Sequence, residues 1–164
     1  LLLSSAASDV YKRQYYDYST KNMKHIFSIF YKLLKKHDFQ IVVIPSMRTP
    51  LNTIHYAKEF FGENHTVIMN VDKKAYLSAL AISENIIVTC DSSSMISEAA
   101  LTVKPIYIAN ILPKKNDITF QRFRNLFREL NITRNLGEDM ENWSYQSLDE
   151  TNRVAKIINE KIKN

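Results

Sequence analysis

Runs of apolar, mostly β-branched residues alternate along this chain with amphipathic stretches of helical period. Four such runs lie near residues 40–45, 66–71, 86–90 and 105–110. Each is short and continuously apolar, which is typical of strands covered on both faces. Strands that alternate with helices form right-handed βαβ units, and such units build a parallel sheet. The sequence therefore predicts an α/β, Rossmann-like fold with one parallel sheet and helices on both faces.

The expected helices have recognisable starts and ends. Apolar residues between Lys21 and Lys36 recur every three or four positions, as on one face of a helix. Thr49-Pro50 is typical of an N-cap followed by a first-turn proline, and Gly62 suits the residue that ends a helix. Further helices are expected over residues 74–83, from Ser94 to Val103, over residues 120–130, and from the capping box at Ser147 to about Lys161.

Composition bounds the class of protein. The chain has 164 residues, 45% hydrophobic and 24% charged, which suits one domain with a buried core. Its formal charge of +5 is scattered, so it permits an anionic ligand or a membrane surface but indicates no nucleic-acid partner. The single cysteine, Cys90, fits a reducing compartment. No apolar run approaches the roughly 20 residues that span a bilayer, and we expect a cytoplasmic protein, with peripheral membrane contact permitted.

Residues 1–14 (LLLSSAASDVYKRQ) do not match the rest of the chain. They begin without methionine and resemble a translated adapter or vector tail. A signal peptide is the alternative, but the apolar part is too short and no basic segment precedes it. We therefore expect residues 1–14 to be a non-native scar, residues 15–164 to be the domain, and the native protein to extend further toward its N-terminus.

Polar residues follow the predicted strands where a parallel sheet binds ligands, beyond the carboxyl ends. The loop at residues 45–50 carries a cation and two hydroxyls, and the loop at 91–94 places three serines at a helix start. Exposed N–H groups there, with the macrodipole behind them, favour an anion such as a diphosphate. A carboxylate one turn later can accept ribose hydroxyls. The candidate ligand-binding residues are Ser46, Arg48, Thr49, Ser92, Ser93, Ser94 and Glu98.

Each candidate also has a purely structural explanation. Aspartate and serine are preferred N-caps, so the serine cluster is equally explained as helix capping. Arg48 is equally explained as a solvated loop residue, and Glu98 as a surface acid. Asp91 counts against a phosphate because its carboxylate would repel one. With only two glycines in the chain, no glycine-rich phosphate loop exists.

The sequence gives little indication of a metal site or of catalytic residues. The four histidines lack metal-ligand spacing and no Ser/His/Asp arrangement can be argued, so we expect no metal and no cofactor and assign no catalytic residue. Trp143 and Tyr145 are expected to pack the last helix onto the domain. A basic set after the fourth strand is either a solvated face or a second anion contact or interaction surface. That set comprises Lys114, Lys115, Arg122, Arg124 and Arg128.

Several segments together resemble a known family. The segments PSMRTP, AYLSALAISENIIVTCDSSSMISEAALTVKPIYI, RFRNLF and WSYQSLDETNRVAKII look like the C-terminal part of the "elongated mitochondria" family. That family comprises plant mitochondrial-fission factors and many bacterial relatives. The resemblance covers about Thr20 to Lys161, and residues 86–107 are its most specific part. The family is in turn similar to the C-terminal half of GT-B glycosyltransferases and of sugar-nucleotide epimerases.

The resemblance implies roles for the candidate residues. Ser46, Arg48 and Thr49 match the loop that faces the donor diphosphate, residues 92–94 match the phosphate-facing helix start, and Glu98 matches the acid that holds ribose. Three departures from the family pattern stand out. Met47 replaces an arginine that usually follows the first loop serine, and the strand and glycine-rich loop expected before Lys21 are missing. The N-terminal half, which carries acceptor binding in a GT-B enzyme, is also missing.

Two classes of function follow from this resemblance. The first is the half of a glycosyltransferase-like or epimerase-like enzyme that binds a nucleotide-diphosphate sugar, inactive alone without the N-terminal half. The second is a non-catalytic adaptor whose GT-B-like body recruits a protein partner at a membrane surface. Arg48, the serine cluster and Glu98 favour the first, because an adaptor would not require them. Base, sugar and acceptor are not identifiable from the sequence.

Overall fold

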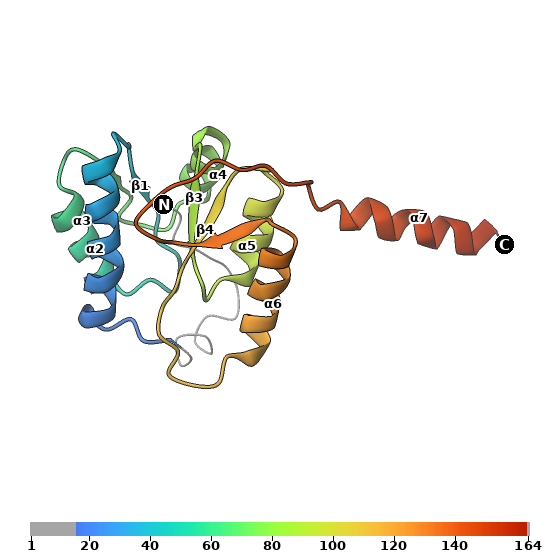
Figure 1. Cartoon of the computed structure of the whole chain (residues 1–164), viewed down its shortest axis with the longest axis horizontal. Coiled ribbons are helices and arrows are strands. Elements are labelled where there is room, and N and C mark those ends of the chain that lie inside the picture. Colours follow the sequence, from blue (N-terminus) through green and yellow to red (C-terminus); the bar gives the residue numbers. More distant parts are fainter. Residues whose placement is uncertain (1–15, 164) are drawn as a thin grey trace.

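The computed structural model describes residues 16–163 (Figure 1). The predicted scar at residues 1–14 lies outside this range. The fold is α/β with parallel strands flanked by helices, which confirms the predicted Rossmann-like class. The elements are α2 (Thr20–Lys36), β1 (Val42–Val43), α3 (Leu51–Phe61), β2 (Thr66–Val67), α4 (Lys73–Ile82), β3 (Ile86–Thr89), α5 (Ser93–Ala100), β4 (Ile106–Ala109), α6 (Ile118–Glu129), β5 (Thr133–Asn135) and α7 (Glu150–Lys163).

Hydrogen bonding divides these strands into two parallel groups. β1 pairs with β2, with Val42 opposite Thr66. β4 lies between β3 and β5, with Ile106 opposite both Ile86 and Thr133. Where we expected one continuous sheet, the described residues thus form a two-stranded and a three-stranded group.

The division has a topological reason. In a right-handed βαβ unit, a strand preceding α2 would lie beside β1, on the edge away from β2. No strand of residues 16–163 occupies that edge of β1 or the edge of β3 away from β4. A cavity of about 440 Å³ lies between the two groups and is lined by Val42 of β1 and Ile87 of β3. The family resemblance implies a strand before α2, and the gap between β1 and β3 is where such a strand would fit.

The core lies between β3–β4 and the helices. All residues of β3 and β4 are buried, which is the burial that their continuously apolar sequences predict. A cluster of aromatic rings joins α2 to α3, in which Phe27 contacts Phe60 and Phe61 at centroid distances of 5.1 and 5.6 Å. In Figure 1, α2 and α3 lie together at one side of the molecule and α5 and α6 at the other.

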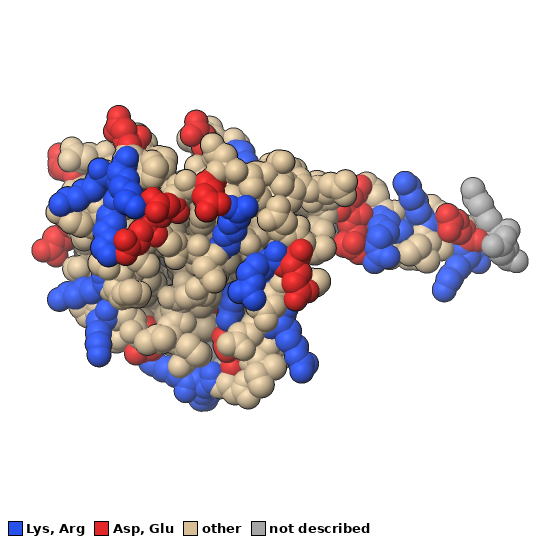
Figure 2. All heavy atoms as spheres, viewed as in Figure 1, with Lys and Arg blue, Asp and Glu red and all other residues tan. Residues whose placement is uncertain are grey.

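The segment after β5 packs on the three-stranded group, but α7 does not. The Trp143 ring lies edge-on to Tyr107 at 5.0 Å, and the Tyr145 hydroxyl donates to the Lys104 carbonyl at 2.9 Å. We expected these aromatics to hold the last helix on the domain; instead they fix the segment before it. α7 projects away from the body, with charges of both signs along it (Figures 1 and 2). None of the helices in residues 16–163 has the length and apolar composition that a bilayer crossing needs.

Candidate functional site

The loop before α3 uses its hydroxyls internally. The Ser46 N–H donates to Thr49 Oγ1 at 2.9 Å, and the Arg48 N–H donates to Ser46 Oγ at 3.0 Å. The Thr49 N–H closes a turn onto the Ser46 carbonyl at 3.0 Å. Ser46 is buried and Thr49 is half-buried. These two candidate residues therefore shape the loop, and they hold Arg48 in a fixed position.

Arg48 is buried, with only 1% of its side chain exposed. Its Nη1 donates to the Asp91 carbonyl at 3.2 Å and lies 3.4 Å from the Asp91 carboxylate, and its Nη2 donates to Ser92 Oγ at 3.0 Å. We expected Arg48 to face a ligand cleft. The structure instead places it in an ion pair that ties the 45–50 loop to the start of α5. The physical reason is Asp91, which is also buried and neutralises the guanidinium.

The serine cluster is split by burial. Ser92 is fully buried and precedes α5, but its side chain accepts from Arg48 and makes no capping bond to the helix. The helix-capping explanation therefore does not hold for the Ser92 side chain. Ser93 and Ser94, the first two residues of α5, are half-buried. The Ile96 N–H donates to the Ser92 carbonyl at 3.1 Å, as in the first turn of a helix. Ser93 and Ser94 thus provide the partly exposed surface of this helix start.

Glu98 lies one turn further along α5 and is exposed. The Tyr76 hydroxyl, from α4, donates to Glu98 Oε2 at 2.5 Å and so links the two helices. Burial of Tyr76 and this hydrogen bond raise the pKa of the phenol above its ordinary value. Tyr76 is one site residue that sequence reasoning missed, because nothing in the local pattern of α4 indicates its partner on α5.

Tyr18 is the other missed residue. It lies just before α2 and beside the Arg48–Asp91 pair, where burial and then the Asp91 carboxylate raise the pKa of its phenol well above the ordinary value. With Ser46 and Thr49 it lines a cavity of about 20 Å³. A space of that size holds roughly one water molecule. The loop side of the site is thus closed, and the side formed by Ser93, Ser94 and Glu98 is the exposed one.

A second polar cluster lies beneath α6. Arg124 donates to the Asp117 carboxylate at 2.8 Å, to the Cys90 carbonyl at 3.0 Å and to the Tyr16 hydroxyl at 3.1 Å. The Tyr16 hydroxyl donates to the same Asp117 carboxylate at 3.2 Å. The solvated-face explanation of the basic set is therefore wrong for Arg124, whose guanidinium is paired with Asp117.

Cys90 should be inert toward thiol reagents while the protein is folded. Burial raises the pKa of its thiol to about 11, so roughly one molecule in a thousand carries the reactive thiolate at pH 8. We expect a chromogenic disulfide reagent to leave the native protein unmodified at pH 8 and to titrate one thiol after urea is added. Reaction of the native protein at the rate of a free cysteine would contradict the buried placement.

Comparison with known proteins places these features in a family. The mitochondrial fission protein ELM1 of Arabidopsis thaliana is 33% identical over 118 residues, which cover 69% of this chain and 27% of that protein. An uncharacterized protein of Rickettsia prowazekii is 40% identical over 86 residues, which cover 51% of this chain and 24% of that protein. The matched region thus spans about a quarter of each curated relative. No solved structure matches the chain.

The family model described as mitochondrial fission ELM1 matches residues 12–162. That match includes both loops of the candidate site and all the described strands. It confirms the family resemblance drawn from the sequence segments at residues 45–50, 75–108, 122–127 and 143–158. The chain therefore belongs to the mitochondrial fission ELM1 family.

Proposed function

We propose that this chain forms the part of a GT-B-like protein that binds the diphosphate of a nucleotide sugar. The observation that carries the proposal is the bonding of Arg48 to Asp91 and Ser92, which fixes the start of α5 at the carboxyl end of β3. A helix start held in this way presents its N–H groups and the positive end of its dipole to an anion. Ligands of open parallel sheets bind at this edge.

In this proposal some candidate residues contact the nucleotide sugar and the others position those that do. Ser93 and Ser94 contact the diphosphate, because they are the partly exposed residues at the helix start. Glu98 accepts the ribose hydroxyls, and Tyr76 orients its carboxylate. Ser46, Arg48, Thr49 and Ser92 are positioning residues. Because Asp91 balances Arg48, the guanidinium steadies the helix start without adding a net charge beside the phosphates.

The reaction, in this proposal, belongs to the whole protein. A GT-B-like enzyme binds the acceptor with its other half, and the matched region spans about a quarter of each curated relative. We propose that the chain binds the donor but does not turn it over alone. Sugar transfer or sugar-nucleotide epimerisation is the class of reaction that such a donor site would serve.

The second candidate function is an adaptor, and α7 is the observation that favours it. This helix projects from the body and exposes four aliphatic residues at helical spacing. They are Val154, Ile157, Ile158 and Ile162. An exposed apolar stripe of this kind suits a protein partner or a membrane surface. This role would leave Ser93, Ser94 and Glu98 without a ligand.

A thermal-shift screen separates the two functions. The chain is heated with UDP-glucose, GDP-mannose or CDP-glucose, and with the free nucleosides at matched ionic strength as controls. A ligand present at a hundred times its Kd stabilises the folded state by about 2.7 kcal/mol, which raises Tm by at least about 5 °C for a chain of this size. We expect one nucleotide sugar to give such a rise. If none does, the adaptor function is favoured.

A further inference from the structure

A third cavity, of about 290 Å³, lies between α6 and the strands β4 and β5. Its lining is strongly polar: three arginines and four carboxamide side chains line it, and no carboxylate does among the described residues. The residues that matter for binding are Asn110, Gln121, Arg124, Arg128, Arg134 and Asn135. Guanidinium and carboxamide N–H groups that converge without a carboxylate suit an anionic ligand.

The three arginines differ in how their charge is balanced. Arg124 is paired with Asp117 at 2.8 Å. Arg134 is paired with Glu141 and lies over the Trp143 ring at 4.4 Å. Arg128 is exposed, its Nη2 donates to the neutral Asn125 side chain at 3.1 Å, and within residues 16–163 no carboxylate forms an ion pair with it. The cavity therefore carries one guanidinium charge that its described surroundings leave unbalanced.

The strand side of the cavity adds donors. Asn110 follows β4 and Asn135 ends β5, and the Asn110 amide donates to the Asn135 side-chain oxygen at 3.0 Å. This bond uses one hydrogen of the Asn110 amide and one lone pair of the Asn135 oxygen, and the two amide hydrogens of Asn135 are donors that it does not use. Donors therefore reach the cavity from α6 and from both strands. A phosphate group, whose three terminal oxygens point in different directions, uses such an arrangement better than a planar carboxylate does.

We propose that this cavity binds the phosphate group of a small phosphomonoester, with Arg128 as its principal cation. A volume of about 290 Å³ lies just below the roughly 300–1,000 Å³ range of small-molecule sites, which suits a sugar phosphate and not a dinucleotide. The cavity shares no lining residue with the candidate site at α5. The inference therefore does not depend on the proposed function, and either one can fail alone.

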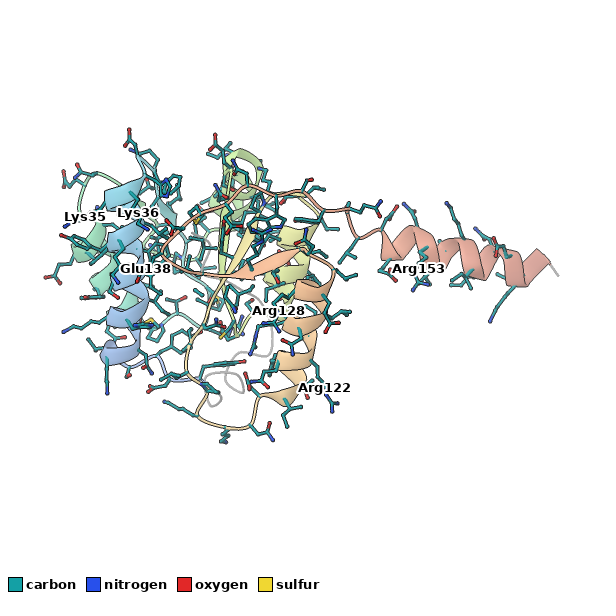
Figure 3. All side chains as sticks on the ribbon, viewed as in Figure 1. Lys35, Lys36, Arg122, Arg128, Glu138 and Arg153 are labelled. Atoms are coloured by element: carbon teal, nitrogen blue, oxygen red, sulfur yellow. The ribbon has the colours of Figure 1, made fainter. Side chains whose placement is uncertain are left out.

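Arg122 provides a matched control, because it lies on the same helix, is exposed and does not line the cavity (Figure 3). Amide NMR spectra of the whole chain are recorded while ribose 5-phosphate, ribose or acetate is added at low ionic strength. We expect ribose 5-phosphate to produce saturable shifts of the Asn110 and Asn135 side-chain amides, and ribose to produce none. Arg128→Gln should weaken that binding about tenfold, and Arg122→Gln should leave it unchanged.

Three results would overturn the proposal. One is the absence of saturable shifts in the wild-type chain. The second is equal weakening by Arg128→Gln and Arg122→Gln, which would reduce the effect to net charge. The third is acetate binding as tightly as ribose 5-phosphate, which would remove the phosphate assignment. Both variants alter exposed side chains, and a native circular dichroism spectrum confirms that they fold.

Discussion

Arg48→Met should destabilise the folded protein by about 3–5 kcal/mol, because it leaves the buried Asp91 carboxylate without its partner. The two side chains are 1% and 3% exposed, so water cannot replace the lost interaction. Arg48 also donates to Ser92, and this bond is lost in the same variant. The free energy of unfolding is measured by urea denaturation at pH 7, monitored by circular dichroism.

An exposed ion pair of this chain supplies the control. Lys36 lies 2.7 Å from Asp139, with side chains 46% and 71% exposed. Lys36→Met should change the free energy of unfolding by less than about 1 kcal/mol, because solvent screens such a pair. The double variant Arg48→Met/Asp91→Asn should be more stable than Arg48→Met, since it contains no unpaired buried charge. If Arg48→Met costs no more than Lys36→Met, the ion pair is not structural and Arg48 returns to the ligand-contacting residues.

The fold class was predictable because its signals are local. β3 and β4 are continuous apolar runs, and burial on both faces is what such runs imply. β5 was missed because Thr-Arg-Asn has no apolar periodicity and pairs only through its neighbour β4. The break between β1 and β3 depends on strand order, which hydrophobic patterns do not encode.

The sequence predicted where the two loops of the candidate site lie but not the direction of the Arg48 side chain. Sequence reasoning brought the 45–50 loop and the serine cluster to one edge, and hydrogen bonds from Arg48 to Asp91 and Ser92 join them there. Whether Arg48 faces solvent or an internal carboxylate depends on a contact between residues 43 positions apart. Asp91, first considered only as an obstacle to phosphate, was the available signal for that contact.

The second large effect is expected at the first residue of α5. A proline at Ser93 removes one N–H donor and the hydroxyl while leaving the helix intact, because a first-turn N–H has no carbonyl partner within the helix. Ser92 already has φ −111° and ψ 83°, so no helical residue would precede the new proline. Ser93→Ala, which keeps the N–H and loses only the hydroxyl, is the matched control.

Calorimetric titration tests the diphosphate site directly. The wild type, Ser93→Pro and Ser93→Ala are each titrated with the nucleotide sugar found in the screen and with its nucleoside. A hydrogen bond to a charged group contributes roughly 1.5–3 kcal/mol. Ser93→Pro should therefore weaken the binding of the nucleotide sugar about 10- to 100-fold. Ser93→Ala should weaken it less, and neither variant should alter the weak binding of the nucleoside. If Ser93→Pro binds the nucleotide sugar as tightly as the wild type, the start of α5 does not hold the diphosphate and the proposed function is contradicted.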